Sequence, residues 1–174
     1  MVKTCYLCPL GKTRKNVVFG EGNPNARLMF IGEGPGSYED QTGRPFVGRS
    51  GQLLTNIITN VLNLRREDVY IANIVKCRPP NNRVPNMDEA NSCRAYLLKQ
   101  IELVNPEIIV ALGRVSYHHL TRDYDKKMHQ VRGEIFDLGN AKLMPTFHPS
   151  FMLRNPSSKR EVYKDMLRIK DMLS

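Results

Sequence analysis

The chain has 174 residues, of which 41% are hydrophobic, and it carries a formal net charge of +9 at pH 7. Its length suits one domain with a substantial core, and its composition excludes a disordered protein. No apolar run approaches the roughly 20 residues of a membrane-spanning helix, and the first residues lack the apolar centre of a secretory signal. We therefore expect a single domain over residues 1–174, a monomer in the cytoplasm with no membrane partner.

The excess of Lys and Arg over Asp and Glu favours a polyanionic partner. Basic residues gather in residues 12–15, 76–83 and 154–160. A positive charge also occurs in soluble basic proteins that bind no polyanion, so charge alone does not identify the partner.

The four cysteines are spaced like ligands rather than like disulfide partners. Cys5 and Cys8 form a Cys-x-x-Cys pair near the N-terminus, whereas Cys77 and Cys93 lie far downstream. In an intracellular protein this pattern favours a metal site or a redox pair over two disulfides. Thiolates suit zinc or an iron–sulfur cluster, but a zinc ribbon usually has a second close pair, which is missing here. Spacing alone leaves zinc, a cluster and buried free cysteines open.

Short apolar runs predict the strands of the protein. Residues 28–31, 69–75 and 108–112 have the continuous apolar character of buried parallel strands. Residues 131–136 and 142–147 flank a turn, and we expect them to pair as late strands.

Helical patterns alternate with these strands. Apolar residues recur on one face of residues 53–62, and a short helix is expected at residues 113–121. A helix over residues 90–104 follows a capping-box spacing at Asn86 and Glu89, and the final helix follows a similar spacing at Ser158 and Glu161. This alternation predicts an α/β fold, a three-layer α/β/α sandwich around a short, mostly parallel sheet.

Residues 32–51 form an unusually long, Gly-rich connection after the first strand. Their glycines let backbone amides approach a flat or anionic ligand closely, and Phe46 sits among them. The pattern lacks the spacing of a dinucleotide fingerprint and the Gly-Lys-Ser/Thr of a P-loop, and it is one residue short of a nucleophile elbow. Loops at the carboxyl ends of parallel strands meet at one sheet edge, so this connection is expected to lie in a ligand site.

Two further polar residues follow predicted strands. Asn73 lies near the end of the apolar strand at residues 69–75, where a buried amide is costly unless its donors and acceptors are matched. It either satisfies a nearby turn or reads the edge of a planar base. His148 precedes Pro149, which enforces a turn that would expose the imidazole.

Together these segments resemble the iron–sulfur (family 4) uracil-DNA glycosylases of bacteria and archaea. The resemblance rests on Gly32-Glu33-Gly34-Pro35-Gly36, on Gly43-Arg44-Pro45-Phe46-Val47-Gly48, on Asn73-x-x-Lys76-Cys77-Arg78-Pro79-Pro80, on His148-Pro149-Ser150 and on the cysteine layout. It covers nearly the whole chain. Gly34 replaces the family's usual alanine, and the loop from Arg78 to Pro85 lacks the histidine-bearing insertion of a branch that becomes trapped on DNA, so we expect ordinary turnover.

The resemblance implies a monofunctional uracil-DNA glycosylase that flips uracil out of DNA, hydrolyses its N-glycosidic bond and leaves an abasic site. It implies catalytic roles for Glu33 and His148. The implied uracil-binding residues are Gly34, Glu39, Phe46, Asn73 and His148. The implied DNA-binding residues are Ser50, Arg83, Ser150, Leu153 and Arg154, with residues 151–154 as a wedge in the duplex.

The resemblance also implies one structural four-iron, four-sulfur cluster, held by Cys5, Cys8, Cys77 and Cys93, which fastens the N-terminal segment to the domain. It implies no divalent metal in catalysis and, as partner, single- or double-stranded DNA that contains uracil. A non-catalytic iron–sulfur or zinc module that binds DNA is the alternative, but it leaves Glu33, Phe46 and Asn73 unexplained. A phosphate-ester hydrolase that uses the Gly-rich loop is a third possibility, and it should need a divalent metal.

Overall fold

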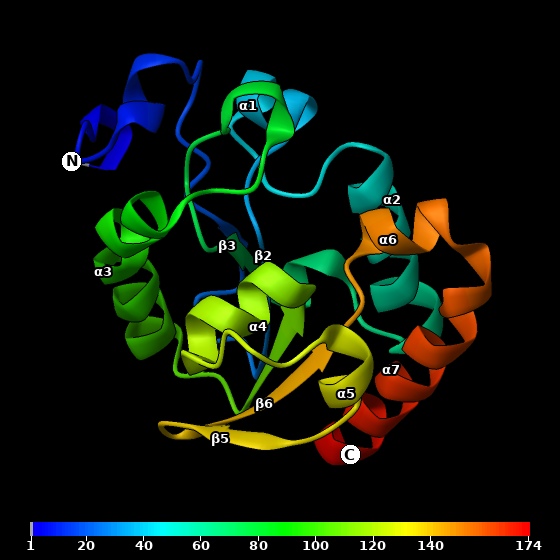
Figure 1. The fold of residues 1–174 in the computed structure, drawn as a ribbon. Coiled ribbons are helices and arrows are strands. Elements are labelled where there is room, and N and C mark those ends of the chain that lie inside the picture. The colour runs from blue at the N-terminus through cyan, green and yellow to red at the C-terminus, as the bar shows by residue number, and fades with distance from the viewer. Residues whose placement is uncertain (1) are drawn as a thin grey trace.

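The computed structural model describes residues 2–174. A six-stranded sheet with the order β1-β3-β2-β4-β6-β5 lies between two layers of helices (Figure 1). Strands β3, β2, β4 and β6 are parallel, whereas β1 and β5 pair antiparallel at the two edges. The predicted three-layer α/β/α sandwich with a mostly parallel sheet is confirmed.

The strands are β1 (Glu21–Gly22), β2 (Leu28–Gly32), β3 (Tyr70–Asn73), β4 (Ile108–Leu112), β5 (Phe136–Leu138) and β6 (Ala141–Thr146). The α-helices are α1 (Ser37–Thr42), α2 (Arg49–Asn56), α3 (Met87–Val104), α4 (Arg114–Thr121), α5 (Met128–Val131), α6 (Pro149–Arg154) and α7 (Lys159–Leu173). A π-helical turn at Ile57–Val61 continues α2. The Gly-rich connection therefore contains a helix, α1, which its sequence did not predict.

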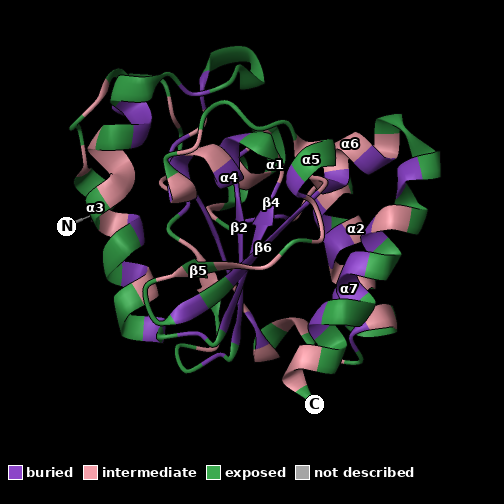
Figure 2. Ribbon diagram, turned by 60° about the horizontal axis from the view of Figure 1, so that its bottom comes forward, coloured by how far each residue is buried: buried purple, intermediate pink, exposed green. Residues whose placement is uncertain are grey.

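Alternating residues of the central strands fill two separate cores. Along β2, Met29 and Ile31 pack with residues of α3 and α4, whereas Leu28 and Phe30 pack with residues of α2, α6 and α7. All five residues of β2 are buried, as expected for a strand covered on both faces. Figure 2 shows the same division, with buried central strands between helices that turn a buried stripe inward.

The helix ends follow their sequence signals in one case and depart from them in another. The side chain of Asn86 accepts from the backbone N–H of Glu89, and Glu89 accepts from the N–H of Asn86, so the predicted capping box at α3 is present. At α7 the Ser158 side chain makes no cap bond and instead donates to the carbonyl of Asn155. The expected capping box there is wrong, because Ser158 already has helical backbone angles.

The prediction of a strand at residues 131–136 is also wrong, except at Phe136. Val131 ends helix α5, where its side chain is buried in the core. Gly133 then turns the chain with φ +78°, a conformation that glycine adopts without strain. Only Phe136–Leu138 pairs with β6, so the apolar run belongs to two elements.

Within residues 2–174, no helix combines the length and apolar character needed to cross a bilayer.

Candidate active site

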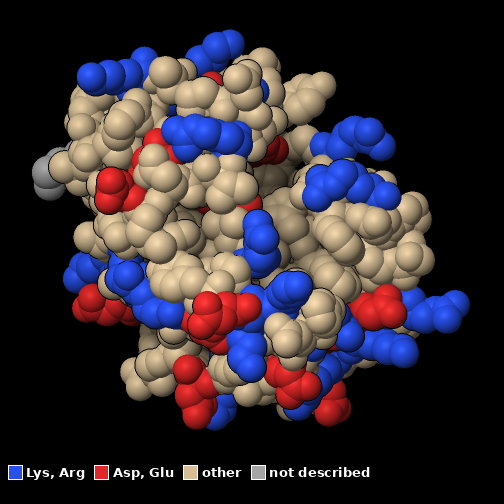
Figure 3. Space-filling model, in the orientation of Figure 1, with Lys and Arg blue, Asp and Glu red and all other residues tan. Residues whose placement is uncertain are grey.

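A cleft of about 660 Å³ opens where the parallel strands end. Most of the predicted site residues line it, namely Glu33, Gly34, Glu39, Phe46, Ser50, Asn73, Arg83, His148, Ser150 and Arg154. In Figure 3 basic side chains border a hollow on the face that carries α1, α4 and α6. The predicted meeting of the loops at one sheet edge is confirmed.

The innermost part of the cleft lies where β2 and β3 end side by side. Gly32 pairs with Asn73 in the sheet, and the N–H of Ile74 donates to the carbonyl of Gly32 over 2.9 Å. A Cβ atom at Gly32 would lie 2.7 Å from Asn73 Oδ1 and 2.6 Å from Phe46 Cζ. Glycine at this position therefore lets the amide and the aromatic ring approach each other.

Asn73 has an unsatisfied acceptor. The residue is 2% exposed, and among residues 2–174 its Oδ1 is the one buried side-chain nitrogen or oxygen without a hydrogen-bond partner. Such an atom costs about 1–3 kcal/mol of stability, so its presence at a cleft indicates a ligand donor that completes it.

Phe46 is held in a strained conformation beside this amide. It is 6% exposed and has φ +50°, a left-handed angle that costs an aromatic residue about 1–3 kcal/mol. Its ring centroid lies 5.5 Å from that of His148, at an interplanar angle of 32°. A Cβ at Gly51 would lie 1.9 Å from the Phe46 carbonyl oxygen, so only glycine fits under this turn.

The tautomer of His148 follows from its neighbours. The backbone N–H of Ser150 donates to His148 Nδ1 over 3.0 Å, which leaves the imidazole proton on Nε2. Burial, helped by the positive charge of Arg154, lowers the pKa of His148 to about 4. The ring is therefore a neutral donor at physiological pH.

Glu33 is a half-buried carboxyl group that begins the Gly-rich connection. Burial raises its pKa above the ordinary value, while the nearby charge of Arg114 lowers it. Arg114 is the first residue of α4 and lines the same cleft. Sequence reasoning missed Arg114, although its place directly after β4 and Gly113 was a usable signal.

Glu39 is bonded to the backbone of its own loop. One carboxylate oxygen accepts from the N–H groups of Val47 and Gly48, both at 2.8 Å, and the other accepts from Gly36 at 3.0 Å. This carboxylate therefore ties the start of the connection to the segment that follows Phe46.

The predicted DNA-binding residues have different surroundings. Arg83 makes a two-point ion pair with the buried carboxylate of Glu89, at 2.7 and 2.8 Å, while Arg154 is exposed at the cleft. Leu153 is partly exposed and does not line the cleft.

The segment predicted as a wedge is the short helix α6. Its Met152 is 1% exposed and belongs to the core, while Phe151 stacks on Phe147 with ring centroids 4.6 Å apart. Met152 therefore has a structural role in the core and is not available as part of a wedge.

The four cysteines converge where the N-terminal segment, the loop after β3 and helix α3 meet. Cys5, Cys8, Cys77 and Cys93 are free thiols that line one small hollow, together with Arg14. Arg14 Nη1 lies 3.5 Å from Cys77 Sγ, and the N–H of Lys76 donates to Cys93 Sγ over 3.3 Å. In the described chain no three Cys, His, Asp or Glu side chains form a group that could hold a metal ion. Four thiols around one hollow are nevertheless the ligand set that an iron–sulfur cluster would need.

Comparisons with known proteins identify the family of the chain. Residues 19–168 match the uracil DNA glycosylase superfamily model. A type-4 uracil-DNA glycosylase of Thermotoga maritima is 50% identical, over 99% of this chain and 91% of the relative. One of Saccharolobus solfataricus is 47% identical, over 99% and 83%, and one of Archaeoglobus fulgidus is 38% identical, over 98% and 89%. The chain belongs to the uracil DNA glycosylase superfamily, in its type-4 branch.

Proposed function

We propose that this protein is a DNA-repair glycosylase that extrudes uracil from DNA, hydrolyses its N-glycosidic bond and leaves an abasic site. The observation that carries the proposal is the buried, unpartnered Oδ1 of Asn73, beside the strained ring of Phe46. An amide acceptor next to an aromatic face suits a planar ligand that carries an N–H on its edge. A pyrimidine base inside a duplex reaches such a pocket only after it is flipped out.

Base recognition falls to Asn73 and Phe46. Asn73 Oδ1 accepts from the N3–H of uracil, while its NH₂ group donates to the neighbouring carbonyl oxygen. Cytosine has an acceptor at N3 and a donor beside it, so the same amide orientation leaves cytosine mismatched. The Phe46 face supports the extruded ring. Glu39 shapes the wall near C5 of the base, which excludes the methyl group of thymine.

Bond cleavage falls to His148 and Glu33. As the bond breaks, negative charge grows on uracil and positive charge grows on the sugar. The neutral His148 donates from Nε2 to a uracil oxygen and stabilises the departing anion. The ionised Glu33 stabilises the cationic sugar and orients the water whose oxygen bonds to C1′. Backbone amides near Gly34 add further donors to the base. No covalent enzyme intermediate and no divalent metal are required.

The DNA backbone is bound by groups around the entrance of the cleft. Arg154, Ser50 and Ser150 contact phosphates of the uracil-bearing strand. Leu153, partly exposed on α6 beside Arg154, enters the space vacated by the base. Arg83 reaches the DNA while Glu89 holds its guanidinium in place. The partner is single- or double-stranded DNA with uracil, and the enzyme acts as a monomer in the cytoplasm.

The cysteines hold one four-iron, four-sulfur cluster (4Fe-4S) through Cys5, Cys8, Cys77 and Cys93. The cluster supplies cross-links between the N-terminal segment and the body of a domain that covers residues 1–174. Leu10 of that segment is 1% exposed and packs in the same core as Val75, so the cluster reinforces an existing contact. Arg14 and the backbone N–H of Lys76 help to compensate the negative charge of the thiolates.

A uracil-release assay tests the proposal. The purified holoprotein is incubated with an oligonucleotide that contains one uracil, in EDTA, and free uracil and abasic sites are quantified. We expect equal yields of both products, and none from a matched thymine oligonucleotide. DNA binding without uracil release would support the non-catalytic module instead, and activity abolished by EDTA would support a metal-dependent hydrolase.

A further inference from the structure

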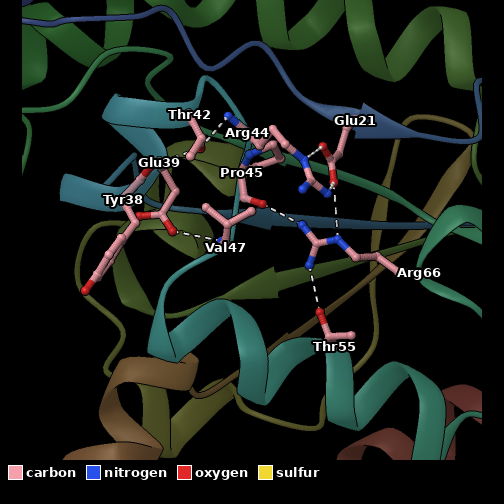
Figure 4. A network of polar contacts seen from close by, with 9 residues as sticks. All are labelled: Glu21, Tyr38, Glu39, Thr42, Arg44, Pro45, Val47, Thr55 and Arg66. Carbon is pink, nitrogen blue, oxygen red and sulfur yellow. Dashed lines mark hydrogen bonds and ion pairs between the residues drawn. The ribbon is translucent and has the colours of Figure 1, made fainter.

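The backbone on both sides of Phe46 is fixed by two side chains, one from the same connection and one from beyond α2. On the C-terminal side, Glu39 accepts the N–H of Val47 over 2.8 Å and so orients the peptide plane after Phe46. On the N-terminal side, Arg66 Nη2 donates to the carbonyl of Pro45 over 2.5 Å and so orients the plane before Phe46. These planes determine ψ and φ of Phe46, and φ has the strained value of +50°. Figure 4 shows both contacts around the same turn.

Arg66 uses its whole guanidinium group in this arrangement. Besides the Pro45 carbonyl, Nη1 donates to Thr55 Oγ1 over 2.8 Å and Nε donates to Glu21 Oε2 over 3.2 Å. Its side chain is 16% exposed. Three acceptors from three different elements leave the planar group one orientation, which a lysine ammonium could not reproduce.

Glu21 anchors the arrangement from the edge strand β1. Its second partner, Arg44, donates to both carboxylate oxygens, over 2.8 and 2.9 Å. Hydrogen bonding to Arg44 and the charge of Arg66 lower the pKa of Glu21, so the carboxylate stays ionised through the neutral range. Neither Glu21 nor Arg66 lines the cleft.

We propose that Arg66, anchored by Glu21, is a positioning residue for uracil hydrolysis, which keeps the Phe46 ring in place against His148 and the flipped base. The proposal rests on the proposed function. A strained backbone persists only where its surroundings impose it, and Arg66 supplies that constraint on one side of Phe46. A small displacement of a group that orients the substrate costs up to about 100-fold in rate. Arg66 therefore acts on the chemistry without contact with the DNA or the base.

A double-mutant cycle tests this role in the holoprotein. In single-turnover experiments with excess enzyme, Arg66→Ala should slow uracil release about 10- to 100-fold, with the Kd for the oligonucleotide changed by no more than about twofold. In a Phe46→Ala background, the same substitution should cost less than about threefold, because its effect passes through Phe46. Equal losses in both backgrounds would overturn the proposal.

Two variants keep this test independent of folding defects. Arg66→Lys preserves the charge but not the three bonds, so it should lose about 10-fold in rate even where it folds like the wild type. Arg27→Ala breaks an Arg27–Glu107 ion pair of 2.6 Å, which lies at the amino ends of β2 and β4, away from the cleft, and it should leave the rate unchanged. A full wild-type rate for Arg66→Lys would count against the proposal.

A spectroscopic readout separates this proposal from the assigned reaction. Because the Phe46 ring lies 5.5 Å from His148, its ring current affects the imidazole proton resonances. These resonances should shift in Arg66→Ala and stay fixed in Arg27→Ala, without any DNA present. If the wild type releases no uracil and the shift still occurs, the proposed function fails, while the constraint of Arg66 on the Phe46 ring stands. Unchanged resonances would refute that constraint.

Discussion

Two groups of residues at the cleft differ in how their polar atoms are satisfied: those that hold the Phe46 backbone, and those that face a ligand. Around Phe46, the Glu39 carboxylate and the Arg66 guanidinium are fully engaged with backbone and side-chain partners. Beside the Phe46 ring, Asn73 Oδ1 has no partner, and the Glu33 carboxyl group is half-buried. His148 accepts at Nδ1, which leaves its Nε2 proton for a ligand.

Glu39 and Arg66 therefore form a scaffold, whereas Asn73, Glu33 and His148 are the groups that act on the substrate. Bonded groups cannot recognise a substrate without losing the contacts they already have, whereas an unmatched acceptor gains its full hydrogen bond from a ligand. The strained backbone of Phe46 is maintained by the bonded residues Glu39 and Arg66. Substitution of Asn73, Glu33 or His148 should therefore cause large losses of catalysis, because these groups face the ligand. Substitution of Glu39 or Arg66 should reduce the rate by misplacing Phe46.

The largest loss should come from Asn73→Asp. Aspartate keeps the acceptors but removes the donor, and it adds a buried negative charge beside a base that becomes anionic. We expect single-turnover uracil release to fall by about 10³-fold or more, with some release of cytosine. Asn73→Ala serves as the comparison, since it removes recognition without adding charge. An unchanged uracil rate in Asn73→Asp would refute the role of this residue in base recognition.

Substitutions at His148 and Glu33 should separate the leaving group from the water. His148→Ala should cost about 10²–10³-fold with uracil, which is typical for one transition-state donor, and should be partly rescued with 5-fluorouracil, which leaves more easily. Glu33→Gln should be slow with both bases. Single-turnover rates on the two oligonucleotides measure this. Equal rescue of both variants would mean that the two roles are assigned wrongly.

The pH dependence of the rate should report Glu33 rather than His148. Glu33 must be ionised, and burial raises its pKa. The rate should therefore fall on acidification, and at a higher pH than an ordinary carboxyl group would give. His148, with a pKa of about 4, protonates only at lower pH. Arg114→Ala removes a charge that lowers the pKa of Glu33, so the acid limb should move to higher pH with little change at pH 8. An acid limb that stays in place would exclude Arg114 from this role.

The smallest effect should come from Arg154→Ala, which removes one phosphate contact. Affinity for plain and for uracil-containing DNA should fall alike, by a few fold, and the slope of log K against log salt should decrease by about one unit. Fluorescence anisotropy over a range of salt concentrations measures both quantities. A loss restricted to uracil-containing DNA would make Arg154 part of base recognition.

The sequence predicted the layers of the fold because each buried strand has a continuous apolar run and each helix a helical period. It also predicted that Glu33, Asn73 and His148 meet, since all three lie at the carboxyl ends of parallel strands. The helix α1 was missed because glycines dominate its surroundings.

Two other features depend on tertiary contacts and leave no local pattern. The role of Arg66 depends on three acceptors from separate elements. The unpartnered Asn73 Oδ1 can be recognised only once every neighbouring donor is placed.

A crystal structure of the protein with bound uracil tests the central claim most directly. The account predicts that the pyrimidine ring lies against Phe46, that uracil N3–H donates to Asn73 Oδ1 within about 3 Å, and that His148 Nε2 donates to a uracil oxygen. Uracil bound elsewhere, or bound in the cleft while Asn73 Oδ1 stays without a partner, would contradict it.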